Sequence, residues 1–398
     1  MFLVSNNFLF TIALDCIQGY RFLEPFAIYL KKYFQANPKL GSRDRKNIRQ
    51  LCYAWWRLGN AVNDLPINER MAVALFLSYN QIDAFSERIF KDEKLLSSIV
   101  LHPKLKRDFL LQNHAIVLNT SELFPLGDLV ESDFSLDDFV YDGFLRRSLW
   151  IRINKKFENE VLAFYENEKV DFKIHPVSKL ALQLPDDFDV LNSEPYMKGW
   201  IEIQDLSSQL LGASYAIQKN EKWLDACAGS GGKSLQLLDM NTDIDLTVTD
   251  IRKSILTNLH LRFKRNHIKQ YKSDVVDWSI ADNLSLQSVF KEYDAIIADV
   301  PCTGSGTWAR TPEQKLCVDK EKIQSFSNLQ YNITNNLVAA LKKGCPLYYS
   351  TCSIYKQENS DVVNRLINNN ALELAEQKMI SGIGSYADTM YFAKLIKQ

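Results

Sequence analysis

The sequence lacks the features that mark membrane, secreted or strongly charged proteins. Its 47 basic and 48 acidic residues nearly cancel, so the average composition indicates no nucleic-acid partner, and any basic surface must be local. No uncharged run approaches the ~18 residues that a membrane-spanning helix needs. The apolar start, 1–13, has no basic flank and is followed by Asp15, so we expect a buried helix there and not a signal peptide. The cytoplasm is therefore the expected location.

The cysteines form none of the usual structural patterns. Their number is odd and no two are spaced as C-x-x-C, which argues against a disulfide framework and against a zinc site. We therefore expect free thiols and no metal site, and most free cysteines are small buried hydrophobic residues. The seven are Cys16, Cys52, Cys227, Cys302, Cys317, Cys345 and Cys352.

The chain is long enough for two or three domains. Apolar residues recur at helical spacing in 22–34 and 48–56, so the first third is predicted to be helical. The stretch 118–145 is acidic and loop-like, and we expect a linker there. The predicted division is a helical domain at 1–140, a small α+β subdomain at 145–200, and a third domain at 201–398.

Basic side chains are concentrated in two segments, 21–49 and 252–272. The first is either a solvated helix face or a surface that contacts phosphates, and the second is another candidate for phosphate contacts. The second group comprises Arg252, Lys253, Arg262, Lys264, Arg265, Lys269 and Lys272.

From about residue 200 onwards, short apolar strands alternate with helical stretches. This alternation predicts parallel strands joined by crossover helices, that is, a doubly wound α/β sheet with ligands at the carboxyl ends of its strands. The expected strands are 222–225, 246–250, 294–299 and 346–350.

A glycine-rich turn, D-A-C-A-G-S-G-G-K at 225–233, follows the first of these strands and leads into a helical stretch. Glycine lets a ligand approach the backbone, and the helix N-terminus offers unpaired N–H groups, although the spacing is not that of a P-loop. Asp250 ends the next strand, where a carboxylate suits ribose hydroxyls or caps the following helix. These features fit S-adenosylmethionine or a dinucleotide, so a dehydrogenase is not excluded by the loop alone.

Two cysteines follow strands on the ligand side of the sheet: Cys302 in D-V-P-C-T-G-S-G and Cys352 in S-T-C-S. C5 of cytosine is too weak a nucleophile to attack a methyl sulfonium, but addition of a thiolate to C6 activates it. Asp299, if protonated, is placed to assist at N3. The second cysteine could then remove the C5 proton. A methyltransferase acting on an exocyclic amine would instead carry Asn/Asp-Pro-Pro-Tyr at this position, and a dehydrogenase would not require the two cysteines.

These motifs together resemble the Sun (Fmu-like) family of RNA cytosine-5 methyltransferases. The loop at 225–233 resembles the family's D-x-C-A-A-P-G-G-K, and 299–304 resembles D-A-P-C-S-G. The segment Y-S-T-C-S at 349–353, followed by Glu358 and Asn359, resembles Y-S-T-C-S…E-N. The resemblance is dense from about residue 199 to the end and implies a Rossmann-like domain that uses S-adenosylmethionine.

By position, the resemblance implies a catalytic and a cofactor-binding set. The catalytic set is Cys352 as nucleophile, Cys302 as the product-release cysteine, Asp299 at N3 and the exocyclic amine, and Lys233 near the target base. The cofactor set is Cys227, Ala228, Gly229, Ser230, Gly231, Gly232 and Lys233 at the methionine part, Asp250 at the ribose, Asp274 at the adenine, and Asp299. Asp277 is the alternative to Asp274.

The chain departs from the family at two places. Gly229-Ser230 replaces the usual Ala-Pro, and Ala309 stands where many members have the first of two arginines. Residues 149–154 resemble the family's small RNA-binding subdomain, and the helical first third resembles the NusB-like extension of the bacterial ribosomal-RNA members. We therefore expect a monomer acting on small-subunit ribosomal RNA, with tRNA as the alternative substrate. A non-catalytic RNA-binding assembly factor is the alternative function.

Overall fold

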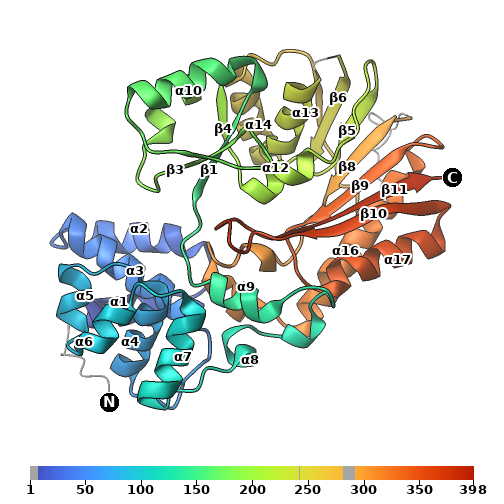
Figure 1. The fold of residues 1–398 in the computed structure, drawn as a ribbon. Helices are drawn as coiled ribbons and strands as arrows, with labels where there is room; N and C mark the ends of the chain where they lie inside the picture. Colours follow the sequence, from blue (N-terminus) through green and yellow to red (C-terminus); the bar gives the residue numbers. More distant parts are fainter. Residues whose placement is uncertain (1–7, 242, 281–291) are drawn as a thin grey trace. The chain divides into compact units, whose positions relative to one another are not determined.

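The structure, a computed structural model, describes residues 8–241, 243–280 and 292–398, which form two compact units (Figure 1). Within these residues, the first unit comprises 8–130, 135–146 and 307–319. The second unit comprises 131–134, 147–306 and 320–398.

The first unit is built from helices whose apolar faces form its core. In α3, for example, Ile48, Leu51 and Cys52 are buried at helical spacing, while the basic Arg43 and Arg49 are exposed. The helices are α1 (Phe8–Gly19), α2 (Phe26–Ala36), α3 (Ser42–Leu58), α4 (Ile67–Ser78), α5 (Ala84–Ile89), α6 (Glu93–Ser98), α7 (Pro103–His114), α8 (Thr120–Leu123) and α9 (Leu136–Asp142).

The stretch 118–145, which we expected to be a linker, contains α8 and α9. Two of its acidic residues are engaged within the first unit: Asp137 and Asp138 of α9 both pair with Lys104 of α7, and Asp137 also pairs with Arg107 at 3.3 Å. The acidic composition of the stretch did not indicate that these two carboxylates pair with a neighbouring helix.

Residues 307–319 belong to the helical unit although they directly follow the Cys302 motif. The Trp308 ring lies 5.1 Å from that of Phe124. Lys315 is buried and donates hydrogen bonds to the carbonyls of Arg57 and Leu123, at 2.7 and 2.9 Å. Burial lowers the pKa of Lys315 to about 7. No sequence pattern indicated this anchoring.

The second unit contains two sheets. The smaller is antiparallel with strand order β2-β3-β1-β4, and Val161 and Tyr165 of α10 lie in the core that forms against it. Its elements are β1 (Leu149–Ile153), α10 (Glu158–Asn167), β2 (Lys173–Ile174), β3 (Ala181–Leu184), α11 (Glu194–Met197) and β4 (Ile201–Ile203).

The larger sheet has seven strands in the order β10-β11-β9-β8-β5-β6-β7. The run from β9 to β7 is parallel, and β11 and β10 close the other edge in antiparallel fashion. Its strands are β5 (Lys222–Asp225), β6 (Asp245–Asp250), β7 (Lys272–Val275), β8 (Ala295–Asp299), β9 (Pro346–Thr351), β10 (Leu372–Ile380) and β11 (Met390–Lys397). Its helices are α12 (Leu206–Gly212), α13 (Gly232–Met240), α14 (Lys253–Arg265), α16 (Lys320–Ala339) and α17 (Ser360–Asn369).

The predicted Rossmann-like fold class is confirmed, together with the four parallel strands that the apolar runs indicated. Trp223, Leu246, Ile297 and Tyr348 of the four central strands are buried in one core on one face of the sheet. The parallel register brings the carboxyl ends of β5, β6, β8 and β9 to one edge, where the candidate site lies.

Candidate active site

The glycine-rich loop connects β5 to α13 with two residues in left-handed conformations. Gly229 has a φ of 53° and Gly231 a φ of 83°. A Cβ on Gly231 would lie 2.8 Å from the Phe263 ring of α14, so only glycine allows this approach. The amide of Gly229 donates to a carboxylate oxygen of Asp250 at 3.0 Å, which joins the loop to the end of β6.

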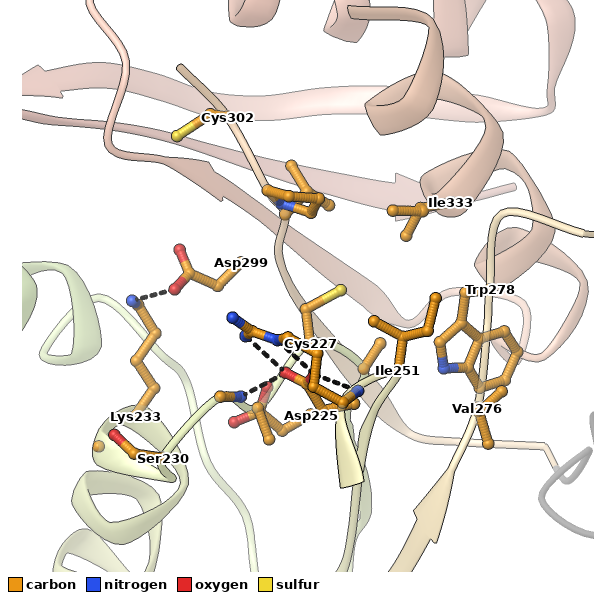
Figure 2. A pocket seen from close by; sticks show the side chains of 18 of the residues that line it. Asp225, Cys227, Ser230, Lys233, Ile251, Val276, Trp278, Asp299, Cys302 and Ile333 are labelled. Carbon is orange, nitrogen blue, oxygen red and sulfur yellow. Dashed lines mark hydrogen bonds and ion pairs between the residues drawn. The ribbon is translucent and has the colours of Figure 1, made fainter. Parts of the chain in front are cut away.

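A cavity of about 700 Å³ opens beside this loop (Figure 2). Most residues of the expected cofactor set line it: Cys227, Ala228, Gly229, Ser230, Gly232, Lys233, Asp250 and Asp299. Gly231 packs against α14 instead. Asp277 lines the cavity and Asp274 does not, because Asp274 lies within β7 whereas Asp277 follows its end.

The two expected cysteines converge. Cys302 follows β8 and Cys352 follows β9, and these neighbouring parallel strands pair Asp299 with Ser350. The two sulfur atoms lie 3.2 Å apart, both thiols are free, and both are partly exposed. Cys302 lines the cavity, and Cys352 adjoins it through this sulfur contact.

Glu358 ties the two cysteine segments together, a role that sequence reasoning did not assign. Its buried carboxylate accepts hydrogen bonds from the amide and hydroxyl of Thr303, at 2.8 and 2.5 Å, and from the hydroxyl of Ser353. Asn359 adds a bond from its side-chain amide to the carbonyl of Ser353 at 2.9 Å. The Glu-Asn pair in the sequence was the available signal, since it accompanies the second cysteine motif.

A close approach of backbones completes this arrangement. The amide of Gly306 donates to the carbonyl of Cys352 at 2.9 Å. A Cβ on Gly306 would lie 2.0 Å from the carbonyl oxygen of Thr389 and 3.0 Å from that of Cys352, so a larger residue would displace these backbones.

Lys233 and Asp299 form an ion pair of 2.6 Å at the cavity wall (Figure 2). Ser350 donates to the other oxygen of Asp299 at 2.8 Å. Burial lowers the pKa of Lys233, but Asp299, Asp225 and Cys352 raise it by more, so it stands above its ordinary value. Lys233 therefore keeps its positive charge, and this charge interacts with Cys352.

Cys302 tends to keep its proton. The hydrogen bond with Cys352, then burial, then the charges of Cys352 and Glu358 raise the pKa of its thiol well above the ordinary value. Cys302 is therefore present mainly as a thiol.

Asp225, which was not among the expected site residues, also lines the cavity. Its side chain is 1% exposed and its Oδ2 accepts a hydrogen bond from Ser234 at 2.6 Å. Its Oδ1 has no hydrogen-bond partner among the described residues. Burial, with Asp299 and Asp250 nearby, raises the pKa of Asp225 to about 7. The site thus holds a buried acceptor without a partner.

The second basic segment is largely neutralised. Arg262 and Arg265 pair with Glu202, Arg252 pairs with Asp250, and Lys272 pairs with Asp245. Arg262 and Arg265 are also largely buried, so these two side chains are poor candidates for phosphate contacts, whereas Arg252 and Lys272 remain exposed. Within the described parts of the chain, no group of three or more His, Cys, Asp or Glu residues is arranged to hold a metal ion. The helices resolved in those parts are too short or too polar to cross a membrane.

The fold and this cavity define a Rossmann-like methyltransferase domain. Residues 213–395 match the family model described as 16S rRNA methyltransferase RsmB/F, so this region of the chain is similar to that family.

Among curated proteins, the ribosomal RNA small subunit methyltransferase B of Shewanella oneidensis is 29% identical, over 65% of this chain and 63% of that protein. The matched region thus spans less than two thirds of its relative. Among solved structures, that of PH0851 covers 99% of this chain and 100% of its own at 20% identity, with a TM-score of 0.71. That of NSun6 from Pyrococcus horikoshii with SFG covers 66% and 94% at 15% identity, with a TM-score of 0.59.

Proposed function

We propose that this protein is an S-adenosylmethionine-dependent RNA cytosine-5 methyltransferase that acts on small-subunit ribosomal RNA. The observation that carries the proposal is the pair of free thiols 3.2 Å apart at adjacent strand ends, beside a cavity with a glycine-rich loop. The name of the Shewanella relative supports the choice of ribosomal RNA. Ribosomal RNA as the substrate implies a cytoplasmic location. We further propose that the protein acts as a monomer, and that the helical unit and the 145–200 subdomain bind RNA.

The cavity residues fit the proposed methyl donor, whose sulfonium would supply the methyl group. A Cβ on Gly229 would have no neighbour within 4 Å, so its backbone is open to a ligand. The free Oδ1 of Asp225 offers an acceptor for an ammonium group. Asp250 suits the ribose hydroxyls. Asp274 and Asp277 remain alternatives for the adenine, and binding of S-adenosylhomocysteine by Asp274→Asn and Asp277→Asn separates them.

In the proposed reaction, the thiolate of Cys352 forms a bond to C6 of the cytosine. The electron pair released in the ring requires a proton at N3, and we assign its supply to the Lys233–Asp299 pair. C5 then takes the methyl group. The target base must be unstacked, as loop or single-stranded RNA permits.

Release of the product requires removal of the C5 proton, which we assign to Cys302. In the free enzyme its pKa is raised first by the hydrogen bond with Cys352 and then by burial and the charge of Cys352. Once Cys352 is bonded to carbon it carries no charge, so two of these causes disappear. Cys302 can then lose its own proton to solvent and take up the C5 proton. The proton at N3 returns to the Lys233–Asp299 pair, and expulsion of Cys352 as a thiolate restores the free enzyme.

The test uses protein, S-adenosylmethionine and ribosomal RNA. Cys352→Ala should abolish formation of 5-methylcytosine, whereas Cys302→Ala should accumulate a covalent protein–RNA adduct that survives a denaturing gel. Cys345→Ala is the matched control, since Cys345 is also a partly buried free cysteine but precedes β9 and does not line the cavity. An adduct with Cys352→Ala and none with Cys302→Ala would exchange the two roles.

The alternatives give different results in the same assays. Bisulfite mapping of total RNA from a deletion strain should show the lost 5-methylcytosine in small-subunit ribosomal RNA; a loss confined to tRNA would overturn that substrate. A non-catalytic assembly factor would bind RNA but yield neither product nor adduct.

A further inference from the structure

The cofactor loop of this chain has little intrinsic stiffness. Where the family pattern has Ala-Pro it carries Gly229-Ser230, and the next two residues are also glycine. Proline restricts a loop before folding, whereas glycine adds conformational freedom that must be lost on ordering. The amides that would contact a ligand therefore need another restraint if they are to stay aligned.

That restraint is visible in Arg262 of α14. One terminal nitrogen, Nη1, lies 3.3 Å from the hydroxyl of Ser230 and donates to the carbonyl of Ser230 at 3.4 Å. The other, Nη2, donates to the carbonyl of Ile203 at 3.2 Å. The guanidinium thus connects the loop to β4.

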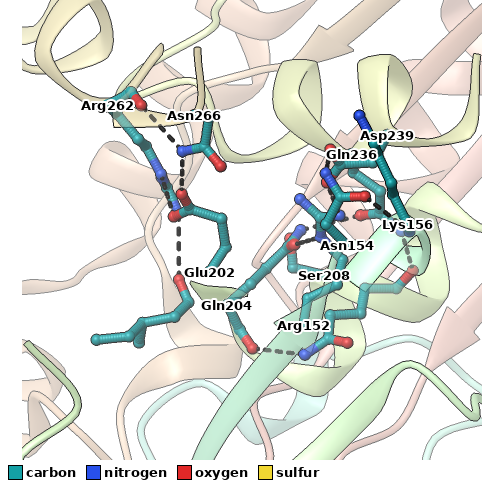
Figure 3. A network of polar contacts seen from close by, with 12 residues as sticks. Arg152, Asn154, Lys156, Glu202, Gln204, Ser208, Gln236, Asp239, Arg262 and Asn266 are labelled. Atoms are coloured by element: carbon teal, nitrogen blue, oxygen red, sulfur yellow. Dashed lines mark hydrogen bonds and ion pairs between the residues drawn. The ribbon is translucent and has the colours of Figure 1, made fainter. Parts of the chain in front are cut away.

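Arg262 is itself fixed by Glu202 of β4 (Figure 3). Its Nε donates to Glu202 at 2.7 Å, and the Glu202 side chain is 4% exposed. Arg265 and Asn266 also bind this carboxylate. Burial by itself would raise the pKa of Glu202, but Arg262 and Arg265 outweigh it, so the pKa lies below its ordinary value. The anchor is therefore a permanently ionised group in a buried position.

We propose that Arg262, held by Glu202, is a positioning residue that fastens the cofactor loop through Ser230. In this chain it supplies the restraint that proline supplies in the family pattern. The inference rests on the proposed function in one respect, namely that the loop binds S-adenosylmethionine. Arg262 also lines the cavity, so direct contact with the ligand is the competing explanation.

The first experiment measures binding of S-adenosylhomocysteine by calorimetry, without RNA. Arg262→Ala should weaken binding about tenfold, the equivalent of about 1.4 kcal/mol. Arg265→Ala is the matched control, because Arg265 binds the same carboxylate as Arg262 but does not contact Ser230. This variant should change the affinity less than about twofold. In each variant the Glu202 carboxylate still accepts hydrogen bonds from one arginine and from Asn266. Equal effects of the two variants would overturn the proposal.

The second experiment separates action through the loop from direct contact. Ser230→Pro breaks no backbone hydrogen bond, because the Ser230 amide donates none within the described residues, and Ser230 does not have a positive φ. Added to Arg262→Ala, it should restore most of the lost affinity. Failure to restore it would assign Arg262 to the ligand and refute the positioning role.

A third measurement needs no ligand. Amide hydrogen exchange of the 225–235 peptide should be faster in Arg262→Ala than in the wild type, and unchanged in Arg265→Ala. If the wild type did not bind S-adenosylhomocysteine, the proposed function would fail, yet this exchange would still test the restraint. Unchanged exchange in Arg262→Ala would rule it out.

Discussion

Asp225→Asn should make the stability of the protein less dependent on pH. The Asp225 carboxyl is 1% exposed, and Ser234 provides the hydrogen bond to its Oδ2. Burial raises its pKa from 3.8 to about 7. An asparagine has nearly the same shape and can still accept the bond from Ser234, but it cannot ionise.

The magnitude follows from linkage. Because the folded pKa is raised, the folded protein holds the Asp225 proton more tightly than the unfolded chain, so stability is lost as pH rises from 3.8 towards 7. A shift of about three pKa units corresponds to about 4 kcal/mol in total, of which about 3 kcal/mol falls between pH 5 and pH 8. The wild type should therefore lose about 3 kcal/mol more than Asp225→Asn over this interval.

The assay is urea denaturation of both proteins at pH 5 and pH 8. Ser234→Ala serves as a second variant: it removes the bond that lowers the Asp225 pKa, so its stability should fall more steeply with pH than that of the wild type. Parallel pH profiles for the wild type and Asp225→Asn would refute the reasoning, because they would show that this carboxyl does not titrate in the expected range.

Three further perturbations have defined outcomes. Lys315 should affect stability with the opposite sign to Asp225. Its folded pKa of about 7 lies below the ordinary 10.5, so the free energy of unfolding of the wild type should rise by about 2 kcal/mol relative to Lys315→Met between pH 7 and pH 9, as measured by denaturation. Glu358→Gln should leave binding of S-adenosylhomocysteine within about twofold but slow adduct formation at least tenfold in the Cys302→Ala background, because Glu358 aligns Thr303 and Ser353; an unchanged adduct rate would contradict that role. Gly231→Ala should destabilise the protein by at least about 1 kcal/mol and weaken S-adenosylhomocysteine binding, since its φ is 83°; an unaltered melting temperature would contradict the strain.

Much of the candidate site could be predicted because it lies in short local patterns. A Gly-rich turn between a strand and a helix, and a cysteine directly after a buried strand, are readable in a few consecutive residues. Parallel pairing of β8 with β9 then brings Cys302 and Cys352 together, as the strand alternation indicated. What could not be predicted depends on pairs distant in sequence, such as Glu358 with Thr303 or Lys315 with Arg57.

The sequence alone determined the doubly wound sheet, the glycine-rich loop and the placement of two cysteines after neighbouring strands, because hydrophobic periodicity and turn chemistry act between near neighbours. Only the tertiary structure determined which charged side chains are paired. It paired Arg262 with Glu202, left one oxygen of Asp225 without a hydrogen-bond partner among the described residues, and made 307–319 part of the helical unit. The physical reason is that the state of a charged side chain depends on burial and on partners that the fold brings within about 4 Å, and no local pattern encodes that distance.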